Sequence, residues 1–203
     1  MRITVMTICS DSYWPLMKLC MPDKLEYCLR HNYQLSIKKC ILPIQTFMYE
    51  REVLMLEDLK GCDVLVFTGA DTLITNLSIK LEHFIENFDF DFLIGKDVNG
   101  INNDVFFLKN NERSITFLKW VIDARTTFST DQDAMKVYVD LKTDFRTVIV
   151  PQKLFNAMPY WLYNYKNDGG GTWKPGDFIF HCPGLPFDSR VKVMNEILTK
   201  VVR

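Results

Sequence analysis

An aspartate and a histidine each follow a short hydrophobic run in this sequence. Asp71 comes after the run of residues 63–67, and His181 comes after the run of residues 178–180, just before Cys-Pro-Gly184. A carboxylate oxygen and an imidazole nitrogen together suit Mn²⁺ or Mg²⁺, with diphosphate oxygens and water completing the coordination. Each residue also has a structural interpretation, because Asp is common in turns and a lone His more often makes a hydrogen bond than binds a metal.

Two polar segments offer groups that can contact a sugar. The amides of residues 99–104 (Asn-Gly-Ile-Asn-Asn-Asp) can bond sugar hydroxyls, although Asn-Gly is also a strong signal for a hairpin turn. Residues 129–133 (Ser-Thr-Asp-Gln-Asp) place a carboxylate and an amide at the start of a predicted helix. There, Ser129 or Thr130 as the N-cap explains much of the composition without any function.

An aromatic and glycine-rich stretch occupies residues 158–173. Its aromatic faces can stack on sugar rings, and its three consecutive glycines favour a mobile loop. The glycines lack the spacing and the Lys of a P-loop. An acceptor-binding lip and a plain surface loop are equally good interpretations of this stretch.

The elements that must position these residues alternate between strand and helix. Hydrophobic runs predict strands over residues 2–8, 33–37, 62–67, 90–94, 105–108, 147–150 and 178–180. Apolar residues at helical spacing predict helices over residues 14–29, 48–59, 114–124, 131–139 and 190–202. This alternation predicts a single α/β domain with a doubly wound, mostly parallel sheet flanked by helices. Ligands of such sheets bind beyond the carboxyl ends of the strands.

Bulk properties argue against several classes of protein. The chain has 203 residues, a formal net charge of −1 and no long Lys/Arg cluster, so we expect no nucleic-acid partner. No stretch approaches the ~20 apolar residues of a membrane span, and the opening run is too short for a signal peptide. The six scattered cysteines are interpreted as reduced, mostly buried thiols. We therefore expect a cytosolic protein with no membrane insertion.

Four motifs follow one another along nearly the whole chain. They are Val64-Leu-Val-Phe-Thr-Gly-Ala-Asp71-Thr-Leu-Ile-Thr-Asn76, Gly100-Ile-Asn-Asn-Asp-Val-Phe-Phe-Leu108, Asp131-Gln132, and Gly176-Asp-Phe-Ile-Phe-His181-Cys-Pro-Gly184. The ordered set, over residues 2–184, resembles the GT-A glycosyltransferase family that includes fungal α-galactosyltransferases and plant xyloglucan xylosyltransferases. The compact length is also similar to that of glycosyltransferases encoded by large algal (chlorella) viruses, and this likeness implies a location in the host cytoplasm.

The resemblance implies one GT-A domain over residues 1–203. Its donor-binding half is about residues 1–100, and its acceptor and metal half is about residues 101–203. It also implies a UDP-sugar donor, a glycan or glycoprotein acceptor, Mn²⁺ as the usual ion with Mg²⁺ as the alternative, and retention at the anomeric carbon.

Specific residues take roles through the same resemblance. Asp71 and His181 match the metal ligands, and Asp131 and Gln132 match residues near the reacting carbon, where Asp104 is a third catalytic candidate. The donor-binding candidates are Thr7, Ile8, Arg51, Ala70, Asp71, Asn102, Asn103 and Gly184.

Two positions depart from the family pattern. Gly69 stands where the first Asp of Asp-x-Asp is expected, which removes a carboxylate from the metal and ribose site. Asp104 stands where the family has a Gly, and it supplies a carboxylate near the donor sugar.

Two alternative functions stay open. A nucleotidyltransferase is disfavoured because residues 9–14 lack a Gly-rich basic loop. A catalytically degenerate sugar-nucleotide or glycan-binding module stays open because Gly69 replaces the first Asp, and fold alone does not guarantee function.

Overall fold

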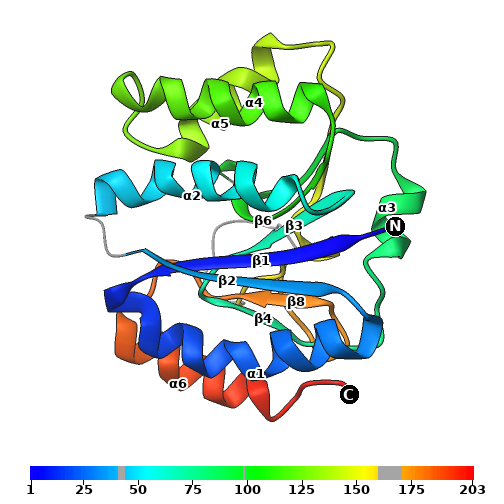
Figure 1. Ribbon diagram of the computed structural model, residues 1–203. Coiled ribbons are helices and arrows are strands. Elements are labelled where there is room, and N and C mark those ends of the chain that lie inside the picture. The colour runs from blue at the N-terminus through cyan, green and yellow to red at the C-terminus, as the bar shows by residue number, and fades with distance from the viewer. Residues whose placement is uncertain (41–43, 98, 160–170) are drawn as a thin grey trace.

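The fold is built on a six-stranded sheet with the strand order β2-β1-β3-β6-β5-β7 (Figure 1). The computed structural model describes residues 1–40, 44–97, 99–159 and 171–203, with the backbone alone for residues 44–48. The strands are β1 (Ile3–Ser10), β2 (Gln34–Cys40), β3 (Val64–Thr68), β5 (Phe92–Asp97), β6 (Gly100–Lys109) and β7 (Thr147–Pro151). β6 is antiparallel to both of its neighbours, and the other pairs are parallel. The mostly parallel sheet predicted from the sequence is therefore confirmed.

Helices cover both faces of this sheet. On one face lie α2 (Ile44–Leu59), α4 (Glu112–Asp123) and α5 (Asp131–Leu141), and on the other lie α1 (Trp14–His31) and α6 (Phe187–Leu198) (Figure 1). The remaining α-helix of the described residues, α3 (Glu82–Asn87), is short, and the hydrophobic pattern does not predict it. Thr130 caps α5 by accepting a hydrogen bond from the backbone N–H of Asp133, which confirms the capping interpretation of that segment. Among the described residues, no helix combines the length and apolar character needed to cross a bilayer.

A second, two-stranded sheet lies between the main sheet and the α1/α6 layer (Figure 1). It pairs β4 (Thr72–Ile74) with β8 (Ile179–His181) in antiparallel fashion, with Thr72 opposite His181. The backbone N–H of Cys182 also donates to the carbonyl of Asp71 at 3.1 Å. This pairing brings Asp71 and His181, which are far apart in the sequence, close together in the fold.

β5 and β6 form a hairpin in which Asp97 lies opposite Gly100. Gly100 has φ +113°, a backbone conformation that favours glycine, so the hairpin interpretation of Asn-Gly is confirmed. β6 starts at Gly100, earlier than the predicted 105–108, because residues 100–102 pair with residues 95–97 of β5. A register shift then leaves residues 103–105 of β6 without partners on β5. The polar amides therefore sit on a strand in the middle of the sheet.

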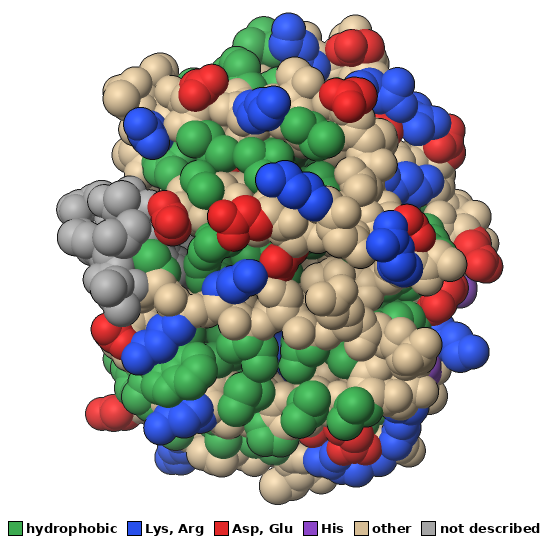
Figure 2. Space-filling model, in the orientation of Figure 1, with side chains coloured by type: hydrophobic (Ala, Val, Ile, Leu, Met, Phe, Trp, Pro, Cys, Tyr) green, Lys and Arg blue, Asp and Glu red, His purple; other side chains and the backbone are tan. Residues whose placement is uncertain are grey.

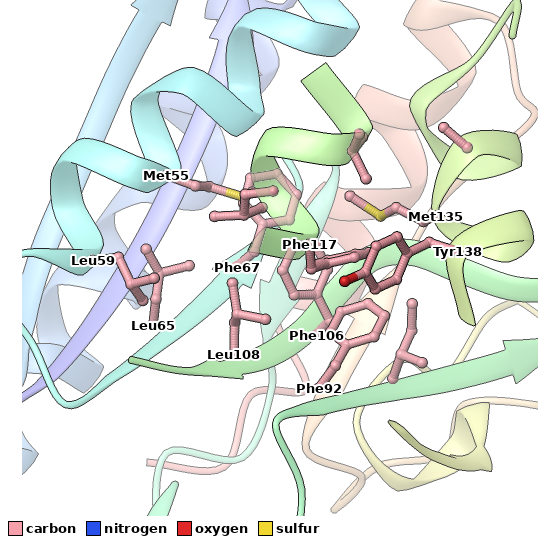
Figure 3. Close-up of a cluster of buried hydrophobic side chains, with 14 of the residues drawn as sticks. Met55, Leu59, Leu65, Phe67, Phe92, Phe106, Leu108, Phe117, Met135 and Tyr138 are labelled. Atoms are coloured by element: carbon pink, nitrogen blue, oxygen red, sulfur yellow. The ribbon is translucent and has the colours of Figure 1, made fainter. Parts of the chain in front are cut away.

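Aromatic side chains fill the core between the sheet and the α2/α4/α5 layer (Figure 3). Phe117 of α4 lies 5.0 Å from Phe92 and 4.9 Å from Phe145, centroid to centroid. Each fully buried aromatic of this size contributes about 1.5–3 kcal/mol through removal from water. The tight packing gives a rigid base for the residues at the carboxyl ends of β1 and β3.

Candidate functional site

Two carboxylates and an imidazole meet where β3, β6 and β8 come together. One ligand atom from each of Asp71, Asp104 and His181 lies within 4.8 Å of the others. His181 Nε2 is 3.3 Å from Asp104 Oδ2 and 3.6 Å from Asp71 Oδ1. Both ring nitrogens of His181 are buried and, among the described residues, neither has a hydrogen-bond partner. Because buried polar atoms are normally paired, this imidazole indicates a group that the residues themselves do not supply.

The donor set fits a divalent cation. Two carboxylate oxygens and one imidazole nitrogen suit Mn²⁺ or a similar ion, with positions left for other oxygens. Desolvation raises the pKa of the Asp104 carboxyl, and His181 opposes that rise while Asp71 adds to it. A bound cation would reverse the repulsion between the two carboxylates.

Three hydrogen bonds to Gly69 hold the turn that carries Asp71 in place. The backbone N–H of Gly69 donates to the carbonyl of Asp104 at 2.7 Å, and the Thr72 hydroxyl donates to the carbonyl of Gly69 at 2.8 Å. Lys24 of α1 is fully buried, and its ammonium also donates to the Gly69 carbonyl, at 2.7 Å. Burial lowers the pKa of Lys24 to about 8. These bonds fix Asp71 relative to β6 and α1.

A side chain at position 69 would enter the space that the Asp104 carboxylate fills. A Cβ added at Gly69 would lie 3.1 Å from Asp104 Oδ1 and 3.3 Å from Asp71 Oδ1. The Asp104 carboxylate therefore occupies the region that a side chain at position 69 would enter. The two departures from the family pattern are adjacent in space, and a carboxylate remains beside Asp71.

A second polar group lies behind β6 and centres on Arg51. Its guanidinium contacts Glu52 Oε1 at 2.8 Å, Asp131 Oδ2 at 2.6 Å and the Asn103 carbonyl at 3.1 Å. Asp131 Oδ1 accepts from the Asn103 side chain, and Gln132 Oε1 accepts from the Asn103 backbone N–H, both at 3.2 Å. Burial raises the pKa of Glu52 to about 8. The predicted residues Arg51, Asn103, Asp131 and Gln132 are thus brought together, with much of the Arg51 guanidinium bonded to protein groups.

A cavity of about 300 Å³ opens at the carboxyl ends of β1 and β3. Five of the predicted site residues line it, namely Ile8, Arg51, Ala70, Asp71 and Asp104. Tyr13 and Arg190 also line it, although the sequence motifs did not include them. Gly184, with φ +73°, follows the cavity-lining residue Pro183.

Two predicted donor-binding side chains point elsewhere. The Thr7 hydroxyl lies 3.3 Å from the Lys24 ammonium and 3.7 Å from the Met17 sulfur, under α1. The Asn102 side chain donates to Asp97 and accepts from Asn156 at 2.9 Å. Their side chains support the strands around the cavity.

Most of the predicted aromatic acceptor segment, residues 160–170, lies outside the described residues. Trp173 follows it and is buried, with its indole N–H donating to the Thr75 hydroxyl at 2.9 Å and its ring 5.6 Å from that of Phe180. Trp173 is therefore a packing residue that fixes one end of the segment.

On the described part of the face drawn in Figure 2, Lys and Arg side chains are interspersed with Asp and Glu.

Comparison with family models shows the family of this chain, and comparison with solved structures shows its fold. A model of the galactosyl transferase GMA12/MNN10 family matches residues 52–186. A glycosyltransferase involved in glycosylation of the major capsid of PBCV-1 aligns over 97% of this chain and 100% of its own, with TM-score 0.77 and 15% identity. The galactosyltransferase LgtC, in complex with donor and acceptor sugar analogs, aligns over 98% and 96%, with TM-score 0.60 and 10% identity. Mouse xyloside xylosyltransferase 1 aligns over 92% and 100%, with TM-score 0.55 and 8% identity. No curated protein sequence matches the chain.

Proposed function

The chain belongs to the galactosyl transferase GMA12/MNN10 family, and from this premise we propose that it transfers a sugar from a UDP-sugar to a glycan or glycoprotein acceptor with the help of a divalent cation. That the chain is a glycosyltransferase follows from the family and agrees with the GT-A fold. The nucleotide, the cation, the retention of anomeric configuration and a cytoplasmic location are proposals.

One observation carries the cation proposal. The buried His181 imidazole has no hydrogen-bond partner among the described residues and faces the carboxylates of Asp71 and Asp104. The cavity that the two carboxylates line is placed where ligands of open α/β sheets bind. We propose Asp71, Asp104 and His181 as the cation ligands, so Asp104 moves from a catalytic role to a metal-binding one.

The reaction requires stabilisation of the leaving diphosphate. A divalent cation held by these ligands would supply Lewis-acid stabilisation of the negative charge that develops there. Asn103 lies next to Asp104 on β6, and Asp131 and Gln132 fix its side chain and backbone. We propose that this group orients β6 against the donor sugar. The acceptor hydroxyl would then attack the face from which UDP departs, and a phosphate oxygen of the leaving UDP would take the proton of that hydroxyl. An inverted anomeric configuration in the product would contradict this.

Family membership favours transfer over synthesis of the sugar nucleotide. The argument for a degenerate binding module was the carboxylate missing at Gly69. The Asp104 carboxylate lies beside that position, which weakens the argument.

Calorimetric titration with UDP, GDP and CMP, with and without Mn²⁺, tests the proposal. We expect wild type to bind UDP selectively and only with Mn²⁺, and Asp71→Ala to lose this binding. Asp140→Ala, which removes an exposed aspartate of α5, is the matched control and should bind as wild type does. UDP binding that ignores Mn²⁺ would contradict the cation site, and no nucleotide binding under any condition would contradict the donor site.

A further inference from the structure

Arg190, near the C-terminus, lies next to the three proposed cation ligands, Asp71, Asp104 and His181. It lies in α6, lines the same cavity as Asp71 and Asp104, and has a side chain only 12% exposed. Its Nη1 donates to Asp71 Oδ2 at 2.6 Å, and its Nε donates to the Leu185 carbonyl at 2.9 Å. The guanidinium carbon is 5.3 Å from the centre of the Tyr13 ring. Three contacts therefore fix this guanidinium inside the cavity.

The two oxygens of Asp71 face different partners. Oδ2 accepts from Arg190, and Oδ1 lies 3.6 Å from His181 Nε2, toward the proposed cation position. A cation can use Oδ1 while Oδ2 keeps its bond to the guanidinium. Arg190 and the cation would then share one carboxylate and lie next to each other.

Charge balance indicates that the positive charge of Arg190 stays uncompensated once a divalent cation is bound. Asp71 and Asp104 together carry the charge that balances one divalent cation, so the charge of Arg190 is left for an anion in the cavity. Of the nitrogens of Arg190, Nε and Nη1 are used, and Nη2 has no hydrogen-bond partner among the described residues. A guanidinium in this setting binds phosphate oxygens through charge-assisted hydrogen bonds.

We propose that Arg190 binds the diphosphate of the donor beside the cation, held in place by Asp71. This inference rests on the proposed function, because it assigns a further binding residue to the same site. It makes Asp71 a ligand with two tasks, one toward the cation and one toward Arg190. It also predicts opposite effects on two ligands, since Arg190 attracts the diphosphate but repels the cation.

The experiment measures three affinities by calorimetry, for Mn²⁺ alone, for UDP with saturating Mn²⁺ and for uridine. Arg190→Gln should weaken UDP binding by about tenfold or more, as expected when a hydrogen-bonded charge is lost. Its Mn²⁺ affinity should be tighter, because the repulsion between Arg190 and the cation is lost, and its uridine affinity should be unchanged. Arg190→Lys should fall between Gln and wild type, because it keeps the charge but loses the planar fork.

Arg30→Gln, which removes an arginine of α1 that pairs with Glu26, is the control and should bind all three ligands as wild type does. UDP binding by Arg190→Gln equal to that of wild type would overturn the inference alone. Equal losses for uridine, Mn²⁺ and UDP would also overturn it, because they would indicate a merely structural role. A wild-type protein that binds no UDP with Mn²⁺ would overturn the proposed function and this inference together.

Discussion

Asp104→Asn will weaken Mn²⁺ binding in the absence of nucleotide by about a hundredfold or more. The substitution keeps the size of the side chain but removes one of the two negative charges that face His181, 3.3 Å from its Nε2. Loss of residues that only support metal ligands already costs 10–100-fold in affinity, so loss of a ligand charge should cost at least as much. Electron paramagnetic resonance of free Mn²⁺ measures this affinity without any turnover, and Asp140→Asn provides the exposed control. Unchanged Mn²⁺ affinity in Asp104→Asn would remove Asp104 from the ligand set.

A paired exchange makes the same prediction sharper. A Cβ at position 69 would lie 3.1 Å from Asp104 Oδ1, so a carboxylate at 69 can enter the space that Asp104 vacates. We expect Asp104→Gly to lose Mn²⁺ binding and the double variant Gly69→Asp with Asp104→Gly to recover most of it. Gly69→Asp alone crowds a third carboxylate against the other two and should be less stable than wild type. A double variant that folds but binds Mn²⁺ no better than Asp104→Gly would show that position 69 cannot supply the ligand.

Asp91→Asn will lower the free energy of unfolding at pH 7 by about 2–3 kcal/mol. Asp91 is fully buried and accepts hydrogen bonds from Arg113, Arg146 and Asn111, which is the N-cap of α4. The carboxylate therefore joins the start of β5 to β7 and α4. Chemical denaturation followed by circular dichroism measures the loss. Asp89→Asn removes an exposed partner of the same Arg146 and should cost less than about 1 kcal/mol.

The destabilisation should depend on pH in one direction. Burial raises the pKa of Asp91, but the hydrogen bonds from Arg113 and Arg146 outweigh it and hold the pKa well below its usual range. A carboxyl with a depressed pKa stabilises the fold above its unfolded pKa of about 3.9 and loses that contribution as the pH falls further. The difference between wild type and Asp91→Asn should therefore be full at pH 7 and shrink below about pH 4. An equal difference at pH 7 and pH 3 would contradict the ionic role of Asp91.

The hydrophobic pattern predicted much of the first half of the fold well, because β1 and β3 are buried on both faces and α1 buries one face. Strands β1 and β3 and helix α1 lie close to their predicted ranges. The pattern missed β4 and α3, which have 3 and 6 residues and are too short to show a period. It also shortened β6, since residues 100–102 are held in the strand by pairing with β5, and the register shift that follows interrupts the apolar pattern. The final helix begins at Phe187 instead of residue 190, directly after Pro186.

The site was predicted in its residue types more than in its geometry. Asp71 and His181 were found from their places after hydrophobic runs and from the motif order, and the structure places them together. The proximity of Gly69 to Asp104 could not be read from the chain, because it depends on the pairing of β3 with β6. Arg190 gave no local signal beyond a basic residue early in a helix. The division into a donor half and an acceptor half stays a prediction.

The pairing of β4 with β8 also determines when, during synthesis, the proposed cation site can form. During synthesis Asp71 and the strand β4 that follows it emerge from the ribosome long before β8, which holds His181. Closing so long a loop carries an entropic penalty. A nascent chain that ends before β8 contains all six strands of the main sheet but only two of the three proposed ligands. Capture of the cation would therefore report that translation has passed β8 and that the two-stranded sheet has closed, which makes the ion a marker of completed assembly.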